Sequence, residues 1–400
     1  MTINLFDDGA WLSLRPLTLT RPVADLRVGI LTIAEKWQKY IGTDGYGFQT
    51  SAYLSRKYPL LYGTGLFING SVCPDEAIAG NILDLKSGEV LMAGKLTIAY
   101  RSEAPQEGNS EALWGGQQSC LSSYSVRKYE REFVRITFPE DIFRNNDTEL
   151  KKDFELLTRG RSSGTLSSTN TLIGDQVFIE AGAEAECSTF NSKNGPIYLG
   201  KNSQVWEGSN IRGSFALCHD SQVKMGAKIY GQTTIGPYCR VGGEINNAVI
   251  WGYSSKGHEG YLGNSVLGQW CNIGADSNNS NLKNNYAEVK LWDYSNQKFR
   301  KTGLQFCGLI MADHSKCGIN TMFNTGTVAG VSANIFGGGF PRNYIPDFAW
   351  GGPHGFEIYS LDKMFKTSEL VFQRRDMEFG QIEKDILIHI FEDTKTNRHF

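Results

Sequence analysis

A six-residue repeat of aliphatic side chains constrains the fold of this chain more than any other feature of its sequence. Between residues 199 and 246 the repeated positions are Leu199, Val205, Ile211, Leu217, Val223, Ile229, Ile235 and Val241. A small or compact side chain follows most of them four residues later, at Ser203, Ser209, Ser221, Ala227, Thr233 and Cys239. A period of six fits neither an α-helix nor a single strand, but it is the repeat of a parallel β-helix. We therefore predict a triangular prism in which the aliphatic residues point inward and the small residues turn the corners.

The repeat continues on both sides of this run, from Ile173 upstream to Ala333 downstream. It loses its register over residues 245–265 and 279–303. An insertion in a solenoid commonly forms a loop at one edge, and such loops often carry the binding face. Chance spacing in a β-rich chain is a poor explanation for eight consecutive matches. The sequence thus predicts a long solenoid that is interrupted by two loops.

Composition and charge narrow the class of protein. The chain has 400 residues, a net charge of −2 and eight cysteines, and its isoelectric point is near 6.3. Bulk electrostatics therefore gives no support for nucleic-acid binding. We expect no membrane span, because no apolar run approaches the ~20 residues that one needs, and no secretory leader. The scattered cysteines, several of them at repeat positions, predict a reduced, cytoplasmic protein rather than a disulfide scaffold.

We predict four segments along the chain. Residues 1–156 form an α/β domain, with strands at 3–8 and 65–72, a helix at 31–42 and a hairpin at 88–101. Residues 157–169 are rich in Ser, Thr and Gly and form a linker. Residues 170–340 form the solenoid. Residues 341–400 form a proline-containing bend and two helices, at 360–376 and 381–394, where apolar residues recur at helical spacing.

The stretch YSSKGHEGYLGNSVLGQWCNIGADSNNSN, at 253–281, resembles the acetyltransferase segment of a known family. The solenoid as a whole resembles the hexapeptide-repeat acyltransferases, whose parallel β-helix is left-handed. The full chain resembles the bifunctional UDP-N-acetylglucosamine pyrophosphorylase/glucosamine-1-phosphate acetyltransferase family. That resemblance implies a left-handed β-helix, acetyl-CoA as cosubstrate, and a parallel homotrimer with active sites between neighbouring prisms.

Acetyl transfer to an amine needs a base that removes a proton as the nitrogen attacks the thioester. Of the six histidines, His258 lies in the first register break, in the string SKGHEGY. His258 and Tyr261 match the family's catalytic histidine and a substrate-contacting tyrosine, so we expect His258 to be the base and Tyr261 to contact the sugar phosphate. Glu259 could raise the basicity of the histidine. The alternative is a loop histidine with no role, or one that caps a corner.

The resemblance also assigns residues beyond His258. Asn272 matches an asparagine near the amino sugar, and the backbone of Ala275 matches one that meets the coenzyme. Asn285, Tyr286 and Lys290 stand where the family has substrate-binding residues, although the stretch before them is longer here. Ordinary turn chemistry is the alternative for this asparagine-rich stretch. The following residues, up to Phe306, predict an extruded hairpin that could reach a neighbouring subunit and cover the cleft.

One position departs from the family. Gly242 stands where the family has a lysine that holds the sugar phosphate, and Arg240 is expected to point along a different face. Lys224 lies eighteen residues before Gly242, about one coil away, and could supply the missing cation. Lys316 and Arg342 are candidates for the coenzyme phosphates, with solvated surface as the alternative. The departure suggests a different amino-sugar phosphate or nucleotide sugar as acceptor.

The N-terminal domain keeps part of a nucleotide-binding pattern. The string LRPLTLTRP preserves the second half of the glycine-rich motif of sugar nucleotidyltransferases, so Arg15 and Arg21 are candidates for phosphate binding. The preceding FDDGAW has a single glycine and cannot form the usual nest of amides. The string Ile68-Asn69-Gly70-Ser71 stands where Asn-Gly-Asp is expected, so the usual aspartate for Mg²⁺ is absent there. Magnesium-dependent nucleotidyl transfer by this domain is thus an open possibility.

Three functions follow from these observations. The first is a coenzyme A-dependent acyltransferase that acts on an amino-sugar phosphate or nucleotide sugar through His258. The second is a sugar-1-phosphate nucleotidyltransferase, dependent on Arg15, whose β-helix mainly trimerises. The third is a non-catalytic scaffold or a zinc enzyme, for which His219, His258 and His314 lack close ligand spacing.

Overall fold

The computed structural model describes residues 2–61, 65–102, 121 and 123–400. The chain forms two compact units. Unit 1 comprises residues 1–26 and 31–141, and unit 2 comprises residues 27–30 and 142–400. We describe each unit separately.

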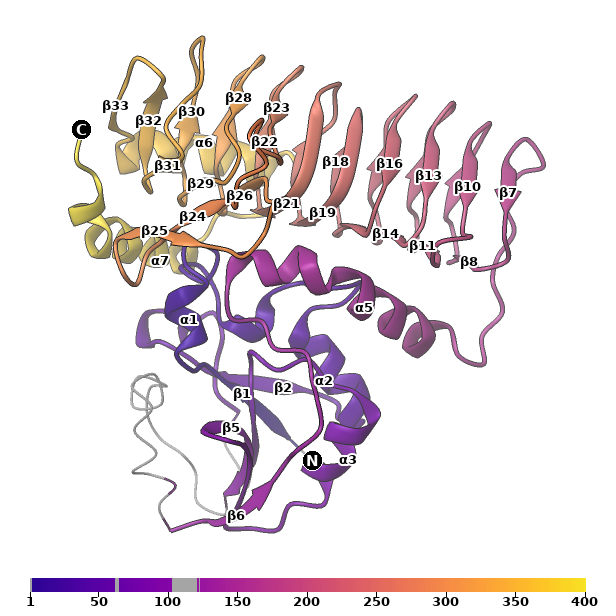
Figure 1. Cartoon of the computed structure of the whole chain (residues 1–400), viewed down its shortest axis with the longest axis vertical. Helices are drawn as coiled ribbons and strands as arrows, with labels where there is room; N and C mark the ends of the chain where they lie inside the picture. The colour runs from indigo at the N-terminus through magenta and orange to yellow at the C-terminus, as the bar shows by residue number, and fades with distance from the viewer. Residues whose placement is uncertain (1, 62–64, 103–120, 122) are drawn as a thin grey trace. The chain divides into compact units, whose positions relative to one another are not determined.

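Unit 1 is an α/β domain with one mixed sheet (Figure 1). In sheet order its strands are β2 (Tyr46–Gln49), β1 (Ile3–Phe6), β3 (Gly65–Asn69), β5 (Leu96–Ser102), β4 (Glu89–Ala93) and β6 (Ser125–Lys128). Strand β1 runs parallel to both β2 and β3, whereas β5 is antiparallel to β3 and to β4. The predicted strands near residues 3 and 65 and the predicted hairpin at 88–101 are confirmed.

The α-helices among the described residues of unit 1 are α1 (Ala10–Ser13), α2 (Ile33–Ile41) and α3 (Glu76–Leu83). Helix α2, which the sequence predicted, starts with a capping box in which Thr32 and Glu35 satisfy each other's backbone amides. It ends at Gly42, whose positive φ of 71° suits a residue without a Cβ. Trp37 of this helix is fully buried, and its indole donates a hydrogen bond to the Val72 carbonyl.

Unit 2 is a left-handed parallel β-helix with three faces, as predicted. The first face contains β8 (Val177–Ile179), β11 (Ile197–Leu199), β14 (Phe215–Leu217), β17 (Thr233–Ile235), the second halves of β19 (Glu244–Gly252) and β21 (Tyr261–Gln269), β26 (Leu309–Met311), β29 (Thr327–Ala329) and β31 (Tyr344–Ile345). The second face contains β9 (Glu184–Ala185), β12 (Gln204–Val205), β15 (Gln222–Val223), β18 (Arg240–Val241), β20 (Ser255–Lys256), β22 (Asn272–Ile273), β27 (Lys316–Cys317), β30 (Asn334–Ile335), β32 (Ala349–Gly352) and the antiparallel β33 (Gly355–Ile358). The third face contains β7 (Thr171–Ile173), β10 (Thr189–Asn191), β13 (Asn210–Arg212), β16 (Lys228–Tyr230), the first halves of β19 and β21, β23 (Asn278–Asn279) and β28 (Met322–Phe323).

The core of the prism is made by the repeat that the sequence shows. The eight aliphatic residues from Leu199 to Val241 are each at most 2% exposed, and they belong to one continuous cluster. The six small residues at the predicted corners are also buried. Burying apolar surface at roughly 25 cal/mol per Å² is the main force that holds such coils together.

The first predicted loop, at 245–265, is wrong. Strands β19 and β21 occupy most of this stretch and run without a break from the third face into the first. The register is lost because the coil is shorter there: Ile235 pairs with Ile250, whereas a full eighteen-residue coil separates Leu217 from Ile235. A shortened coil changes the spacing of the repeat without extruding a loop.

The second predicted loop is confirmed as a hairpin. Strands β24 (Lys290–Asp293) and β25 (Lys298–Lys301) pair antiparallel. We call residues 280–307 the arm. It folds back onto its own β-helix: the ring of Trp292 stacks on Tyr344 at 4.2 Å between centroids, and the Tyr294 hydroxyl donates to Asp347 at 3.0 Å.

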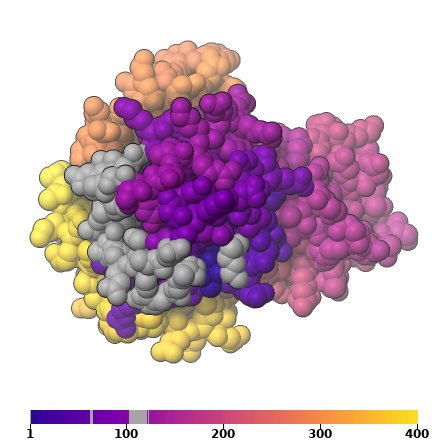
Figure 2. Space-filling model, turned by 90° about the horizontal axis from the view of Figure 1, so that it is seen from below, coloured from indigo at the N-terminus to yellow at the C-terminus, as the bar shows by residue number. Residues whose placement is uncertain are grey.

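Three helices accompany the solenoid. Helix α5 (Pro139–Thr158) covers the outer side of the first face, where Leu150 packs in one cluster with Tyr198 and Ala216. After α5, the amide of Gly164 donates to the Ile179 carbonyl of β8, so the segment predicted as a linker contacts the first coils. Helices α6 (Leu361–Gln373) and α7 (Gln381–Asp393) confirm the two helices expected near the C-terminus. Figure 1 shows the first coils at one end of the solenoid, α7 near the other end, and α6 along the later coils. Figure 2 shows residues 341–400, in yellow, on the side away from the first coils.

Candidate functional site

The second face of the β-helix carries a column of polar side chains. Parallel pairing aligns Arg240 with Ser255, Ser255 with Asn272, and Asn272 with Lys316. Each of these residues precedes a core residue, so alternation along the strand directs it away from the core. Residues that are far apart in sequence thereby stand on four successive coils of one surface.

This column forms one wall of a cavity of about 580 Å³. The end of helix α6 provides another wall, through Val371, Arg374 and Arg375. The remaining lining residues come from the neighbouring columns and corners of the β-helix: Lys224, Tyr253, Gly257, His258, Trp270 and Cys271. The size of the cavity is in the range typical of small-molecule and cofactor sites.

A stack of aromatic rings fixes α6 beside the cavity. Tyr253 stacks on Trp270 at 4.3 Å between centroids, and Trp270 stacks on Phe372 of α6 at 3.9 Å. The ring of His314 lies nearly parallel to Phe372 at 6.2 Å. Tyr253, Trp270 and His314 occupy successive corners with positive φ values of 55–63°, which aligns their side chains in one row. Stacked pairs of this kind contribute about 0.5–1.5 kcal/mol each beyond the area they bury.

The cavity is strongly cationic. Lys224, Arg240, Lys316, Arg374 and Arg375 line it, and none of the described lining residues is an Asp or a Glu. None of these five cations makes a salt bridge with a carboxylate of the described residues. Such a site can bind an anion with several charges, because a ligand that enters meets cations without internal counterions.

The pKa values of these cations reflect their crowding. Burial lowers the pKa of Lys316 to about 8. Burial, and next the charge of Arg240, lowers the pKa of Lys224. Burial and the charge of Arg375 likewise lower the pKa of Arg240. All three groups therefore lose water, and Lys224 and Arg240 also lie near like charge; an anion in the cavity would relieve both effects.

His258 lies at the corner after β20, inside a coil rather than between coils. Its side chain is exposed, and its imidazole makes no hydrogen bond with any residue that the structure describes. The ammonium of Lys256, which is 2% exposed, donates to the backbone carbonyl of His258 at 2.6 Å. Glu259 does not contact the imidazole as expected, because its carboxylate pairs with Lys228 at 3.3 Å.

The structure brings together four of the residues that the sequence singled out: His258, Asn272, Lys224 and Lys316 all line the cavity. Lys224 lies one coil from Gly242, as the eighteen-residue spacing predicts. The expectation for Arg240 is wrong, because its side chain lines the same cavity. Its place in the column could have been found from the register, since it stands one coil after Gln222.

Sequence reasoning missed the contribution of the C-terminal helix. Arg374 and Arg375 end a helix that was predicted, but nothing in the local pattern indicates which coil the helix contacts. Trp270 was also missed. The sequence signal that could have found it is an aromatic residue that recurs at the same corner of successive coils, at Tyr238, Tyr253 and Trp270.

Three other predicted residues lie outside the cavity lining. The hydroxyl of Tyr261 accepts a hydrogen bond from Asn281 at 2.9 Å. The carbonyl of Ala275 accepts from the amide of Asn320 in the next coil. The guanidinium of Arg342 lies over the ring of Phe356 at 5.0 Å, near the C-terminus. Each is held by contacts within the β-helix or its C-terminal end.

Three more residues assigned from the resemblance, Asn285, Tyr286 and Lys290, also lie outside the cavity lining. The side chain of Asn285 accepts from the amide of Ala287, which is the turn chemistry considered as the alternative. Tyr286 is 65% exposed. Lys290 begins β24 and is paired in register with Lys301. In the structure the longer insertion carries all three residues into the arm.

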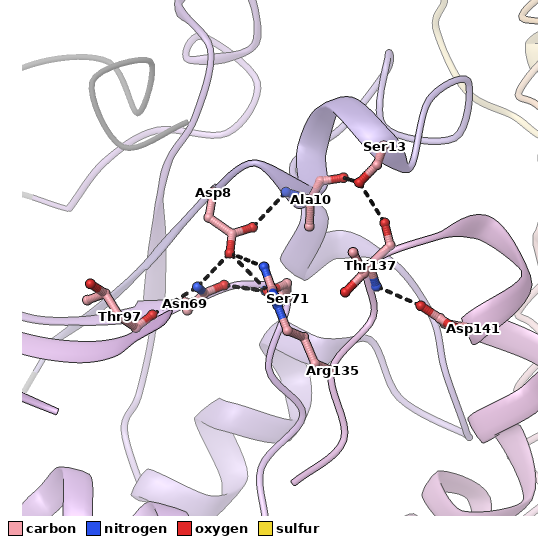
Figure 3. Close-up of polar contacts among 9 residues, drawn as sticks. All are labelled: Asp8, Ala10, Ser13, Asn69, Ser71, Thr97, Arg135, Thr137 and Asp141. Atoms are coloured by element: carbon pink, nitrogen blue, oxygen red, sulfur yellow. Dashed lines mark hydrogen bonds and ion pairs between the residues drawn. The ribbon is translucent and has the colours of Figure 1, made fainter. Parts of the chain in front are cut away.

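A second polar cluster lies in unit 1, at the carboxyl ends of the parallel strands β1 and β3 (Figure 3). Asp8 accepts hydrogen bonds from Asn69 at 2.9 Å and from the amide of Ala10 at 2.9 Å, and it pairs with Arg135 at 2.7 Å. Ser71 bonds to Asn69 at 2.7 Å. The two segments that depart from the nucleotidyltransferase motif, around Asp8 and around Asn69, thus form one hydrogen-bond network.

The donor set of this edge does not fit a bound Mg²⁺. Asp8 is neutralised by Arg135. Burial raises the pKa of the neighbouring Asp7 to about 7, and its oxygens accept from the Thr50 hydroxyl and the Val23 amide. Magnesium requires ionised carboxylate oxygens with free lone pairs. Asp7 and Asp8 already use oxygen lone pairs in these contacts, and the charge of Asp8 is balanced by Arg135.

The candidate phosphate ligands of unit 1 are engaged within the domain. The guanidinium of Arg15 lies over the ring of Trp11 at 4.4 Å. Arg21 is 2% exposed and pairs with Asp25 at 2.8 Å. Opening this partly buried ion pair is costly, because the buried guanidinium of Arg21 would lose a carboxylate partner. The structure does not bring the two arginines to the Asp8 cluster.

Two further features of the described residues bear on the other functions. No group of three His, Cys, Asp or Glu side chains is arranged to hold a metal ion in the part of the chain that the structure describes. The rings of His219 and His314 belong to the aromatic stack, away from the corner that carries His258. Among the same residues, no helix is both long and apolar enough to cross a bilayer.

Comparisons with known proteins address each unit. Residues 3–162 match the family model described as Sugar nucleotidyl transferase. No curated protein sequence matches the chain. A solved UDP-N-acetylglucosamine acyltransferase from Campylobacter jejuni is 12% identical, with a TM-score of 0.32, over 59% of this chain and 92% of that one. Its Arabidopsis counterpart is 16% identical, with a TM-score of 0.24, over 58% and 91%.

An N-acyltransferase from Bacillus cereus, solved with dTDP and coenzyme A, is 12% identical. Its TM-score is 0.22, over 51% of this chain and 91% of that one. Similarity at this level assigns no substrate to the present chain.

Proposed function

We propose that this protein transfers an acyl group from a coenzyme A thioester to the amino group of a sugar phosphate or nucleotide sugar, in the cavity of the β-helix. The observation that carries the proposal is the set of five cations without carboxylate partners, arranged around a cavity that His258 also lines. Both substrates of such a reaction carry phosphate groups. Lysine and arginine side chains bind phosphate through charge-assisted hydrogen bonds.

His258 is the proposed general base. The substrate nitrogen attacks the thioester carbonyl, a C–N bond forms and the C–S bond breaks. The imidazole accepts the proton that the amine loses and passes it to the departing thiolate of coenzyme A. An imidazole without hydrogen-bond partners among the described residues is available for this role. Asn272, on the adjacent coil, presents its exposed amide to the same cavity as a substrate contact.

The test combines binding with turnover. Acetyl-CoA is titrated calorimetrically into the wild type, His258→Asn and Lys316→Gln, and acetyl transfer is measured with amino-sugar phosphates and nucleotide sugars. We expect His258→Asn to bind normally but to lose about 10²–10⁴-fold in kcat, as for removal of a general base. Lys316→Gln should instead weaken binding about tenfold, which is about 1.4 kcal/mol. A wild type that binds no acetyl-CoA would contradict the proposal.

A second candidate activity belongs to unit 1, and the match of residues 3–162 to the sugar nucleotidyl transferase family supports it. We propose that this domain binds a nucleotide or sugar phosphate at the carboxyl edge of β1 and β3, near Asp8. Pyrophosphate release from UTP or dTTP, with a sugar 1-phosphate and with or without magnesium, tests for turnover. Release that Asp8→Asn abolishes would support catalysis. Nucleotide binding without release would limit the domain to binding.

We further propose a cytoplasmic homotrimer. The seven cysteines that the structure describes form no disulfide with one another, which supports a reducing compartment. The trimer is an expectation from the resemblance, and light scattering at micromolar concentration tests it. A monomer would contradict a site shared between chains. It would leave the cavity intact, because α6 of the same chain provides the wall opposite the β-helix.

A further inference from the structure

The contacts of α6 divide into two kinds. Its buried side chains Met364, Ser368 and Phe372 form one stripe at helical spacing, and Phe372 enters the aromatic stack against Trp270. The turn that follows holds Arg374 and Arg375 at the cavity, with the amide of Arg375 donating to the Phe372 carbonyl at 2.8 Å. The helix thus joins an apolar anchor directly to two cations.

We propose that α6 is a wall of the cavity whose docking depends on an anion: Arg374 and Arg375 clamp a nucleoside diphosphate ester against Lys224, Arg240 and Lys316, and the bound ligand in turn holds the helix on the β-helix. This inference rests on the proposed function, because it takes the cavity to be the substrate site. It adds the class of ligand and the element that responds to it.

Electrostatics supports the coupling. With the cavity empty, the two arginines of the α6 end face three cations of the β-helix, and no carboxylate among the described lining residues separates them. Like charges at short range oppose docking, whereas the stack of Phe372 on Trp270 favours it. A polyanion between the two sets changes repulsion into attraction on both sides. By linkage, whatever the ligand adds to helix docking, helix docking adds to ligand affinity.

The spacing of the cations indicates the ligand. Arg240 and Lys316 are separated by three steps of parallel pairing. At ~4.8 Å per step this places their backbones about 14 Å apart. Cations spread over such a length can contact more than one phosphate group, and a diphosphate with a nucleoside attached offers two. Coenzyme A and nucleotide sugars share this chemistry.

Hydrogen–deuterium exchange on the full chain tests the inference. Peptides covering α6 are followed without ligand and with inorganic pyrophosphate, coenzyme A or UDP-N-acetylglucosamine. We expect exchange in α6 to slow at least several-fold with pyrophosphate and with whichever diphosphate ester is the natural ligand. The double variant Arg374→Gln/Arg375→Gln should lose this protection. The matched control Lys363→Gln/Lys366→Gln removes two charges from exposed positions of the same helix and should keep it.

A third variant tests the coupling in reverse. Phe372→Ala removes no charge, yet it should weaken pyrophosphate binding by undocking the arginines. Ligands that bind without slowing exchange in α6, or equal losses in the control variant, would overturn the inference. Failure of the proposed function is a separate result: protection of α6 by a diphosphate ester, with no acyl transfer to any amine acceptor, would keep the clamp and reject the acyltransferase.

Discussion

Two lysines of the second face, Lys316 and Lys256, hold ammonium groups that are largely withdrawn from water. Their coils are separated by the coil of β22. Burial lowers both pKa values to about 8. Lys316 lines the cavity, whereas Lys256 occupies a core position and donates to the carbonyl of His258. One lysine is therefore placed to bind an anion, and the other is placed to fix the corner that carries the proposed base.

The lowered pKa of Lys316 predicts how pH affects binding and stability in opposite directions. Affinity for pyrophosphate should fall as pH rises through about 8, because the ammonium is lost. In the empty protein, the folded state binds fewer protons than the unfolded state between about 8 and the ordinary value of 10.5. The contribution of this lysine to stability should therefore rise with pH across that window.

Calorimetric titration of pyrophosphate across this pH range, in the wild type and Lys316→Arg, provides the measurement. Arginine stays charged throughout, so the variant should lose the part of the pH dependence that centres on about 8. An unchanged profile in the variant would assign the titration to another group.

Gly257 offers a second prediction at the scale of single residues. It lines the cavity, its backbone does not need a positive φ, and an added Cβ would meet only the Ser255 hydroxyl, at 3.6 Å. Gly257→Ala should thus leave the free energy of unfolding within about 0.5 kcal/mol of the wild type. The methyl group should nevertheless reduce ligand affinity, because it projects into the cavity.

Gly338→Ala is the matched control, since a Cβ there meets nothing within 4 Å and the residue lies outside the cavity lining. Denaturant unfolding and coenzyme A titration compare the two variants. Equal coenzyme A affinities of the two variants would show that the ligand does not approach Gly257.

At the scale of elements, the arm is fixed by its own aromatic contacts. Trp292 stacks on Tyr344 and packs edge-on against Phe299. Trp292→Ala should loosen the arm at a cost of about 1–3 kcal/mol, less than for a fully buried tryptophan. Exchange in residues 285–303 should increase, while coenzyme A affinity stays unchanged because the arm does not line the cavity. A loss of affinity would instead support the expectation that the arm covers the cleft.

The elements differ in how far the sequence determined them. The solenoid was predictable because one inward position per six residues must be apolar, from Leu199 to Val241. The coil between Ile235 and Ile250 was misread, since a deletion and an insertion disturb a repeat in the same way. Helix α5 was missed, because its apolar residues, such as Leu150, cover the outside of a sheet that local patterns do not reveal.

At the scale of the whole molecule, net charge and local charge disagree. The chain carries −2 overall, yet five cations gather at one cavity without carboxylates among the described lining residues. Affinity for pyrophosphate should therefore fall steeply with added salt, since the Debye length shrinks from about 10 Å at 0.1 M to about 3 Å at 1 M. Titrations at low and high potassium chloride provide the check. An affinity independent of salt would place binding elsewhere.

The candidate site was only partly predictable from the sequence, because part of its lining depends on a tertiary contact. His258, Asn272, Lys224 and Lys316 stand on coils whose spacing the sequence contains. Arg374 and Arg375 reach the cavity only because α6 packs on the rings at the corners, a tertiary contact with no sequence period. The assignments at Asn285 and Tyr286 came from a resemblance across an insertion, where correspondence between positions is lost.

The alternation along the second face has a consequence for evolvability. Arg240, Asn272 and Lys316 face the cavity, while their immediate neighbours Val241, Ile273 and Cys317 fill the core. Ligand contacts and core packing thus use alternate residues of the same short strands. Substitutions at outward positions can change ligand specificity one residue at a time. The inward positions preserve the β-helix while the protein evolves to accept new substrates.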